Sequence, residues 1–270
     1  MQRFLSIAVR TVAGFLVLVS CSATPLEQDG GDLTRSEVEF LQRKLSEAME
    51  AHWPPLAHKK VTRYVDALGQ AIVARNPSLP PLPYEFVVLR SADVLTASLP
   101  GGKVYVTLGL LQQVEYEGEL AASLAHELAH QHAGHSLRVW RGRVNAARPA
   151  QIILETNGPF EKLFLGKDSY LDLGAEFERE ADETAPALLY RAGFDPRTYG
   201  SFLQIVRRLE KSRLALVQGL VSLHPPADDR VAWAREASLT LPPSRDPKVS
   251  SASFQEIKII LRKVEALRGR

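Results

Sequence analysis

Two histidines four residues apart, His126 and His130, are the clearest sign of chemistry in this chain, and Glu127 lies between them. The surrounding segment, ELAASLAHELAHQHAGH, is rich in residues that favour a helix. Residues four apart share one face of a helix, so both imidazoles can reach one metal ion, and neutral imidazole is a good Zn²⁺ ligand. Glu127 lies beside that face, where its carboxylate can take a proton from water. The pentad HELAH therefore predicts a zinc site that activates water.

A catalytic zinc site needs a third protein ligand and one open position. The extended motif HExxHxxGxxH would require glycine at 133 and histidine at 136, but the chain has Ala133 and Ser136, and His135 comes one residue early. The remaining source is a glutamate on a later helix, and the candidates are Glu155, Glu161, Glu176, Glu178 and Glu180. Of these, the last three lie in the segment 176–182 (EFEREAD), which has a strong helical pattern.

Within that segment, Glu178 and Asp182 are four residues apart and share a helix face. Glu178 can then bind zinc while Asp182 hydrogen-bonds a ligand imidazole and fixes its tautomer. Glu176 and Glu180 would lie off this face, as solvated acids. The spacing alone does not select Glu178 among the candidates.

Four segments of the chain resemble one family of peptidases. They are LPGGKVYVTLGLL (99–111), HELAH followed by His135, EREAD (178–182) leading into RAGFDPRTYGSFL (191–203), and HPPADDR (224–230). In this order they resemble the HtpX-like and BepA-like zinc metalloendopeptidases, relatives of the CAAX prenyl endopeptidase. The resemblance implies one Zn²⁺ per chain, Glu178 as the third ligand, Asp182 as its support and His135 as a structural residue. It also implies that Glu127 acts as the catalytic base of an endopeptidase.

The fourth of these segments holds two residues whose roles stay open. His224 could take the fourth zinc position and keep the enzyme inactive, contact the oxyanion of the intermediate, or cap its own loop. A site permanently closed by His224 would favour a structural zinc protein, because structural sites have four protein ligands. Arg230 could contact the substrate carbonyl, or pair with Asp228 or Asp229, and we expect the pairing.

The segment before the Leu-Pro-Gly-Gly turn departs from the family. Members often have Asn-Ala-Phe-Ala there, where this chain has Leu-Thr-Ala-Ser at 95–98. These residues help to form an edge that binds the substrate backbone, so the departure concerns substrate preference. We expect the strand 103–107 to align a substrate by β-augmentation. An alternative function is a chaperone-like or adaptor lipoprotein that binds peptide beside a latent zinc site.

The elements that position this site predict an α+β fold, a mainly helical zincin-like domain with a small sheet. A capping box at Thr34 and Glu37 begins the first helix, and a second runs from about 56 to 75. Strands at 84–89, 94–99 and 103–108 could pair as an antiparallel sheet, with a tight turn at 100–102. Further helices are expected at about 118–138, 174–191, 196–213, 228–237 and 254–267.

The first residues indicate export. Residues 1–20 have the layout of a signal peptide, and Leu-Val-Ser before Cys21 resembles a bacterial lipobox, in which the cysteine is acylated. Ser22, rather than aspartate, points to the inner face of the outer membrane. We expect a tether at 21–33, a metalloprotease domain at 34–240, and a linker with an amphipathic helix at 241–270. We expect the substrates to be unfolded envelope proteins. The lipid would attach the protein to the membrane, and an envelope assembly complex could be its partner.

Composition excludes several other classes of protein. The formal net charge of +2 is accounted for by Arg3 and Arg10, and no clustered basic patch indicates nucleic-acid binding. The single cysteine excludes an intramolecular disulfide and a cysteine zinc site. After the signal peptide there is no apolar run of 18 or more residues. The chain therefore resembles the periplasmic branch of the family rather than its intramembrane members.

Overall fold

The computed structural model describes residues 33–143, 163–164, 172–210 and 225–264. The helices are α1 (Arg35–His52), α2 (Lys59–Ala74), α3 (Leu108–Gln113), α4 (Glu117–Ala133), α5 (His135–Arg143), α8 (Ala175–Arg191), α9 (Arg197–Glu210), α11 (Ala227–Leu239) and α12 (Ala252–Leu261). The strands are β1 (Glu85–Leu89), β2 (Thr96–Leu99) and β3 (Lys103–Thr107). The predicted α+β fold is confirmed. The segments 1–20 and 21–32 lie outside the described residues, and the domain boundaries stay predictions.

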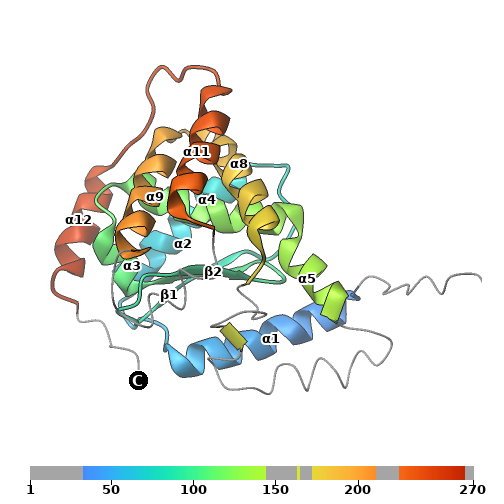
Figure 1. The fold of residues 1–270 in the computed structure, drawn as a ribbon. Helices are drawn as coiled ribbons and strands as arrows, with labels where there is room; N and C mark the ends of the chain where they lie inside the picture. The colour runs from blue at the N-terminus through green and yellow to red at the C-terminus, as the bar shows by residue number, and fades with distance from the viewer. Residues whose placement is uncertain (1–32, 144–162, 165–171, 211–224, 265–270) are drawn as a thin grey trace, which may run out of the picture.

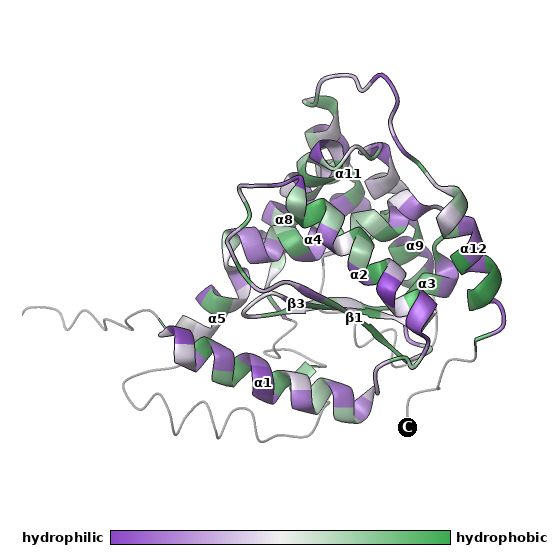
Figure 2. Cartoon of the chain, turned by 180° about the vertical axis from the view of Figure 1, so that it is seen from behind, coloured by the Kyte–Doolittle hydropathy of each residue, from purple (hydrophilic) through white to green (hydrophobic). Residues whose placement is uncertain are grey.

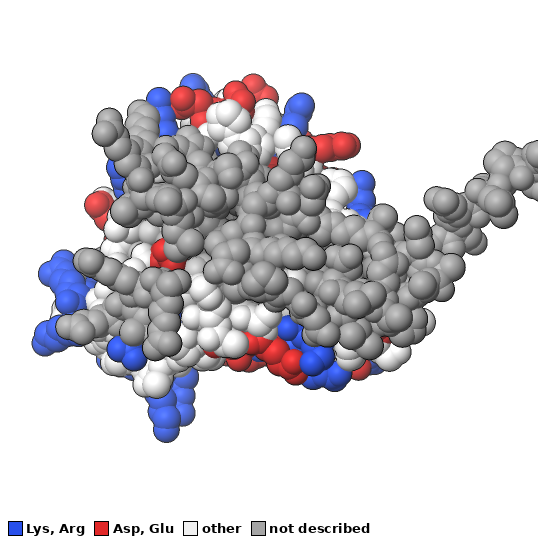
Figure 3. Space-filling view, turned by 60° about the horizontal axis from the view of Figure 1, so that its bottom comes forward, with Lys and Arg blue, Asp and Glu red and all other residues white. Residues whose placement is uncertain are grey.

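The small sheet divides the molecule into two layers. Helix α1 lies on one face of the sheet, and α2, α4, α8, α9, α11 and α12 lie on the other (Figure 1). Helix α1 begins with the predicted capping box, in which the Thr34 hydroxyl accepts from the Glu37 amide and the Glu37 carboxylate accepts from the Thr34 amide. Its outward side carries pairs such as Arg35 with Glu39, and acidic and basic side chains also lie next to one another in the view from below (Figure 3).

The order of the strands corrects the expected antiparallel sheet. The order is β1-β3-β2, with β2 antiparallel to β3 and β1 parallel to β3. The tight turn at Pro100–Gly102 explains the antiparallel pair, since Gly101 and Gly102 have φ of 93° and 103°. Strand β1 instead takes the other side of β3, with Phe86 opposite Val104. Such a pairing between non-consecutive strands leaves no short-range signal in the sequence.

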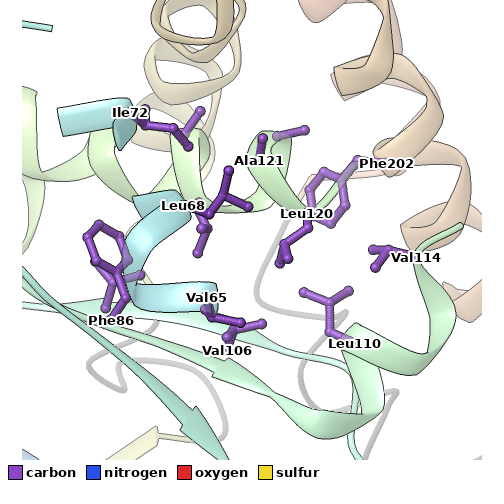
Figure 4. Packing of buried hydrophobic residues seen from close by; sticks show 14 of the residues in the cluster. Val65, Leu68, Ile72, Phe86, Val106, Leu110, Val114, Leu120, Ala121 and Phe202 are labelled. Carbon is purple, nitrogen blue, oxygen red and sulfur yellow. The ribbon is translucent and has the colours of Figure 1, made fainter. Parts of the chain in front are cut away.

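The main core fills the space between the sheet and the upper helices. Helix α2 contributes Val65, Leu68 and Ile72 from one face, and they point toward Val106 of β3 and Leu120 of α4 (Figure 4). The hydropathy view shows hydrophobic stretches in the helices on this side of the sheet (Figure 2). Val65, Leu68 and Ile72 are spaced by three and four residues, as expected for a helix that buries one face. A second cluster, on the other face of the sheet, includes Leu41, Leu45, Met49, Tyr105 and Trp140.

Helix α4 lies at the centre of the upper layer. All residues from Glu117 to Gln131 are buried, and α4 packs on α8, α9, α2 and β2. Small side chains at 121, 122, 125 and 129 allow these close approaches. Within the described ranges, every helix is too short or too polar to cross a membrane.

The helix expected at 118–138 is in fact two helices. Helix α4 ends at Gly134, which has the left-handed φ of 67° and donates its amide hydrogen to the carbonyls of Gln131 and His130. Glycine is the residue that adopts this conformation without a steric penalty. The chain therefore turns at Gly134, and α5 begins in a new direction at His135.

Candidate metal centre

The two histidines of the HELAH pentad lie side by side on buried α4. His126 and His130 are 4% and 2% exposed, and their Nε2 atoms are 3.0 Å apart. Glu127 is also buried, and its carbonyl oxygen accepts a hydrogen bond of 3.4 Å from the Ser98 hydroxyl of β2. The HELAH segment is thus hydrogen-bonded to the sheet and packed on the neighbouring helices.

Helix α8 brings Glu178 to this pair. Its Oε2 lies 3.5 Å from His126 Nε2, and its Oε1 lies 3.4 Å from His130 Nε2. A tetrahedral zinc ion with bonds of about 2.0–2.2 Å separates its ligand atoms by about 3.3–3.6 Å, close to these distances. The nitrogen and oxygen atoms are ligands that Zn²⁺ accepts. The residues present therefore fit a zinc ion. Among the described residues, His126, His130 and Glu178 are the side chains of metal-ligand type that converge on one point.

The far nitrogen of His126 is held by a buried network. His126 Nδ1 lies 2.8 Å from the Tyr199 hydroxyl and 3.2 Å from Asp182 Oδ1, and the Tyr199 hydroxyl donates to Asp182 Oδ1 at 2.6 Å. Burial and the charge of Asp182 raise the pKa of Tyr199 well above its ordinary value, so Tyr199 keeps its proton. Burial alone would lower the pKa of His126, but hydrogen bonds to Asp182 and Glu178 raise it to about 9.

The far nitrogen of His130 has different partners. His130 Nδ1 lies 2.8 Å from His135 Nδ1, and His135 Nε2 lies 3.0 Å from Glu180 Oε2. Burial lowers the pKa of His135, and the hydrogen bond with His135 lowers that of Glu180. His126 and His130 therefore both use Nδ1 for hydrogen bonds, and both direct Nε2 at Glu178.

Arg230 does not make the ion pair expected from the sequence. Its Nε lies 2.7 Å from Asp182 Oδ2 and its Nη2 lies 3.4 Å from Glu178 Oε2, whereas Asp228 pairs with Arg207 at 2.9 Å. Arg230 is 3% exposed because α11 packs on α8 at this point. Asp228 is two residues earlier on α11 and faces outward. The guanidinium of Arg230 therefore balances the negative charges of the Asp182 and Glu178 carboxylates.

The other candidates either are not among the three converging ligand-type side chains or lie outside the described residues. Glu176 and Glu180 are exposed and off the Glu178 face, and His132 is exposed on α4. The candidates outside the described residues are Cys21, Glu155, Glu161 and His224, and their roles stay predictions. Sequence reasoning missed Tyr199, although it lies inside the segment 191–203 that carries part of the family resemblance.

The strand expected to align substrate is not available for that purpose. Strand β3 pairs with β1 on one side and β2 on the other, so its backbone groups are already used. Strand β2 is the outer strand of the described sheet on the side of α4. Next to it, a hollow of about 700 Å³ is lined by His130, Gln131, Pro100 and Gly101, among others.

Comparisons with known proteins agree with this arrangement. The model of peptidase family M48 matches residues 59–238. A β-barrel assembly-enhancing protease of Yersinia pestis is 25% identical over 229 residues, which cover 78% of this chain and 46% of that protein. A mitochondrial metalloendopeptidase of Schizosaccharomyces pombe is 28% identical over 194 residues, 68% of this chain and 56% of that protein. The chain spans about half the length of these two relatives.

A shorter relative is covered more completely. The metalloprotease YcaL of Escherichia coli is 24% identical over 184 residues, which are 66% of this chain and 71% of that protein. The matched family region contains α2 to α4, α8, α9 and nearly all of α11, and hence each described residue of the metal centre. The chain therefore belongs to peptidase family M48, a family of metalloproteases, as the resemblance of its motif segments predicts.

Proposed function

We propose that this chain is a zinc-dependent endopeptidase that cleaves unfolded proteins in the bacterial envelope. The observation that carries the proposal is the convergence of His126 Nε2, His130 Nε2 and the Glu178 carboxylate at one buried point, with Glu127 next in sequence to the first ligand. Membership of family M48 supports the same chemistry.

The proposed mechanism divides the chemistry between the ion and the chain. A Zn²⁺ ion, when bound, supplies a Lewis acid that polarises a water molecule and the scissile carbonyl. Glu127 takes the proton from the attacking water and later delivers it to the leaving amine. Asp182 and Tyr199 hold the Nδ1 side of His126, so its Nε2 faces Glu178. Arg230 balances the negative charge of Asp182 and Glu178.

For the substrate, we propose an extended peptide that lies along the outer edge of β2. An edge strand offers unpaired backbone groups to which a peptide can add as a further strand. The Ser98 hydroxyl contacts the carbonyl of Glu127, so a peptide on β2 would lie beside the catalytic segment. The hollow lined by His130 and the Pro100–Gly101 turn gives room for its side chains.

The central experiment measures zinc content and cleavage of unfolded casein by the same preparations. We expect about one Zn²⁺ per wild-type chain. Glu178→Ala should lose both the zinc and the cleavage, whereas Glu176→Ala, a matched change on an exposed position of α8, should keep both. Glu127→Gln should keep the zinc and lose cleavage by about 10²–10⁴-fold.

Other outcomes separate the alternatives. Zinc without cleavage in the wild type would favour the adaptor lipoprotein with a latent site, and would direct attention to His224. Protein purified without chelator that contains no zinc would contradict the proposal altogether. If Glu127→Gln cleaves as fast as the wild type, the activity comes from a contaminating protease.

The location in the cell is a separate part of the proposal. The lipobox-like sequence supports a lipid on Cys21, and Ser22 supports the periplasmic face of the outer membrane. Relatives named for β-barrel assembly suggest substrates or partners among envelope proteins. Incorporation of a labelled fatty acid into the wild type but not into Cys21→Ser would support the anchor. Equal labelling of both proteins, or none in either, would contradict it.

A further inference from the structure

Different residues contact the Nδ1 atoms of His126 and His130, the two histidines of the metal centre. His130 Nδ1 contacts His135 Nδ1 at 2.8 Å, and His135 Nε2 contacts Glu180 Oε2 at 3.0 Å. We propose that His135 and Glu180 are positioning residues that fix the tautomer of His130, so that its Nε2 lone pair points at the metal. The inference rests on the proposed function, since it assigns the support of one ligand of that site.

The positions of the hydrogens leave one consistent arrangement when His130 acts as a neutral ligand. A neutral imidazole has one N–H and one lone pair, so His130 with a lone pair on Nε2 must carry its hydrogen on Nδ1. That hydrogen is donated to His135 Nδ1, which must then hold a lone pair. His135 consequently carries its own hydrogen on Nε2, and donates it to the Glu180 carboxylate. The carboxylate, which can only accept, sets the tautomer of both rings.

The contacts around His135 restrict the rotation of its ring. His135 is fully buried, and its ring stacks on Phe177 with centroids 4.4 Å apart and planes 5° apart. The Arg138 guanidinium lies 4.3 Å from the Phe177 centroid, and its Nη1 is 3.6 Å from Glu180 Oε2. Glu180 is therefore held from two sides although half of its side chain is exposed. A ring that cannot turn keeps its Nδ1 directed at His130.

Two local features of the chain create this contact. The left-handed turn at Gly134 ends α4, and without it a continuing helix would carry His135 to a different face from His130. On α8, Glu178 and Glu180 are two residues apart and so face different directions. One helix thus supplies both a ligand carboxylate and the carboxylate that orients another ligand.

The first test compares two replacements of His135 that differ in hydrogen bonding. His135→Asn keeps an acceptor oxygen near the place of Nδ1, whereas His135→Leu is similar in size but has no acceptor. The Zn²⁺ dissociation constant, measured by competition with a chromophoric chelator, should rise about 10- to 100-fold in the leucine variant. The asparagine variant should remain within about threefold of the wild type. A purely structural residue would give the opposite order, because leucine suits a buried site better.

The second test uses the exposed end of the chain of hydrogen bonds, where folding is not at risk. Glu180→Ala should raise the Zn²⁺ dissociation constant by about tenfold. Glu183→Ala, an exposed change on the same helix, should leave it unchanged. In Co²⁺-substituted protein, Glu180→Ala should also shift the visible absorption bands, which report the donor strength of the ligands.

The results separate this inference from the proposed function. Wild-type protein that binds no zinc would contradict both. Zinc bound by the wild type, and equally tightly by His135→Leu and Glu180→Ala with an unchanged Co²⁺ spectrum, would overturn this inference and leave the metal site intact. Circular dichroism confirms that each variant is folded, and Glu180→Ala decides the matter if His135→Leu is not.

Discussion

Arg230 and Asp182 form a buried two-point ion pair, in which Nε lies 2.7 Å from Oδ2 and Nη2 lies 2.9 Å from Oδ1. Burial by itself would raise the pKa of Asp182, but the charge and hydrogen bonds of Arg230 lower it to about 2. Asp182 therefore remains a carboxylate at neutral pH and can accept hydrogen bonds from Tyr199 and His126. The pair joins α8 to α11 next to the metal centre, where Arg230 also lies 3.4 Å from the ligand Glu178.

Removal of the arginine should destabilise the fold strongly. We expect Arg230→Met to lower the free energy of unfolding by about 3–5 kcal/mol, because it leaves a buried carboxylate without its cation. Urea denaturation of the metal-free protein measures the change. Arg235→Met, an exposed change on the same helix, should alter it by less than about 0.5 kcal/mol. Equal stability of the two variants would show that Asp182 is not held by Arg230.

Zinc uptake should release a proton from His126. Its pKa of about 9 keeps the imidazole protonated at neutral pH in the metal-free protein, and a metal ligand must be neutral. We expect release of about one proton per Zn²⁺ at about pH 7, with affinity rising about tenfold per pH unit below the pKa of His126. Calorimetry in buffers of different ionisation enthalpy counts the protons. A heat of binding that does not depend on the buffer would contradict this prediction.

Close packing around α3 gives a prediction with a built-in comparison. A Cβ on Gly109 would lie 2.3 Å from the carbonyl oxygens of Ala92 and Asp93, so the backbone would have to move. Gly109→Ala should therefore lower the free energy of unfolding by about 1–3 kcal/mol. Gly200→Ala in helix α9, where a Cβ meets no atom within 4 Å, should raise it by up to about 1 kcal/mol. Thermal denaturation distinguishes the two, and a stabilising Gly109→Ala would be inconsistent with this packing.

The side chain of Lys258 attaches helix α12 to the end of α3. Its ammonium donates to the carbonyl oxygens of Leu111 at 3.2 Å and Gln112 at 3.0 Å, and also to that of Val114. Lys258→Met should lower the free energy of unfolding by about 1–3 kcal/mol, since these carbonyls lose a charged donor. Lys263→Met, at an exposed position nearby, should have little effect. If the two variants unfold at the same urea concentration, the attachment has no energetic importance.

Local signals predicted a large part of this structure. The capping box at Thr34 and the period of the buried residues on α2 depend on neighbours within one or two turns, and both appear as expected. The pairing of β1 with β3 depends on contacts between distant segments, and it was predicted wrongly. The break at Gly134 was missed because glycine is compatible with both a helix interior and a helix end.

The metal centre shows the same limit. The spacing within HELAH placed His126 and His130 together because both lie on one helix, whereas Glu178, on another helix, was selected through the resemblance of EREAD to a family motif. Contacts between helices were not accessible in this way. Glu180 was interpreted as a solvated acid, yet it contacts His135, which lies 45 positions earlier. The partner of Arg230 was likewise assigned to its own helix, when it lies on α8.

Helix α12 has a consequence for the order in which the protein can mature. Phe254, Ile257 and Leu261 are part of the same core as Leu120 of the metal-binding helix. During synthesis the chain emerges from its N-terminus, so the pentad appears more than 120 residues before this helix. Helix α12 packs on α2 and α3, so this part of the core is not covered until residues 252–261 follow. The packing around the metal-binding helix is therefore completed only by residues that lie far downstream of its ligands in the chain.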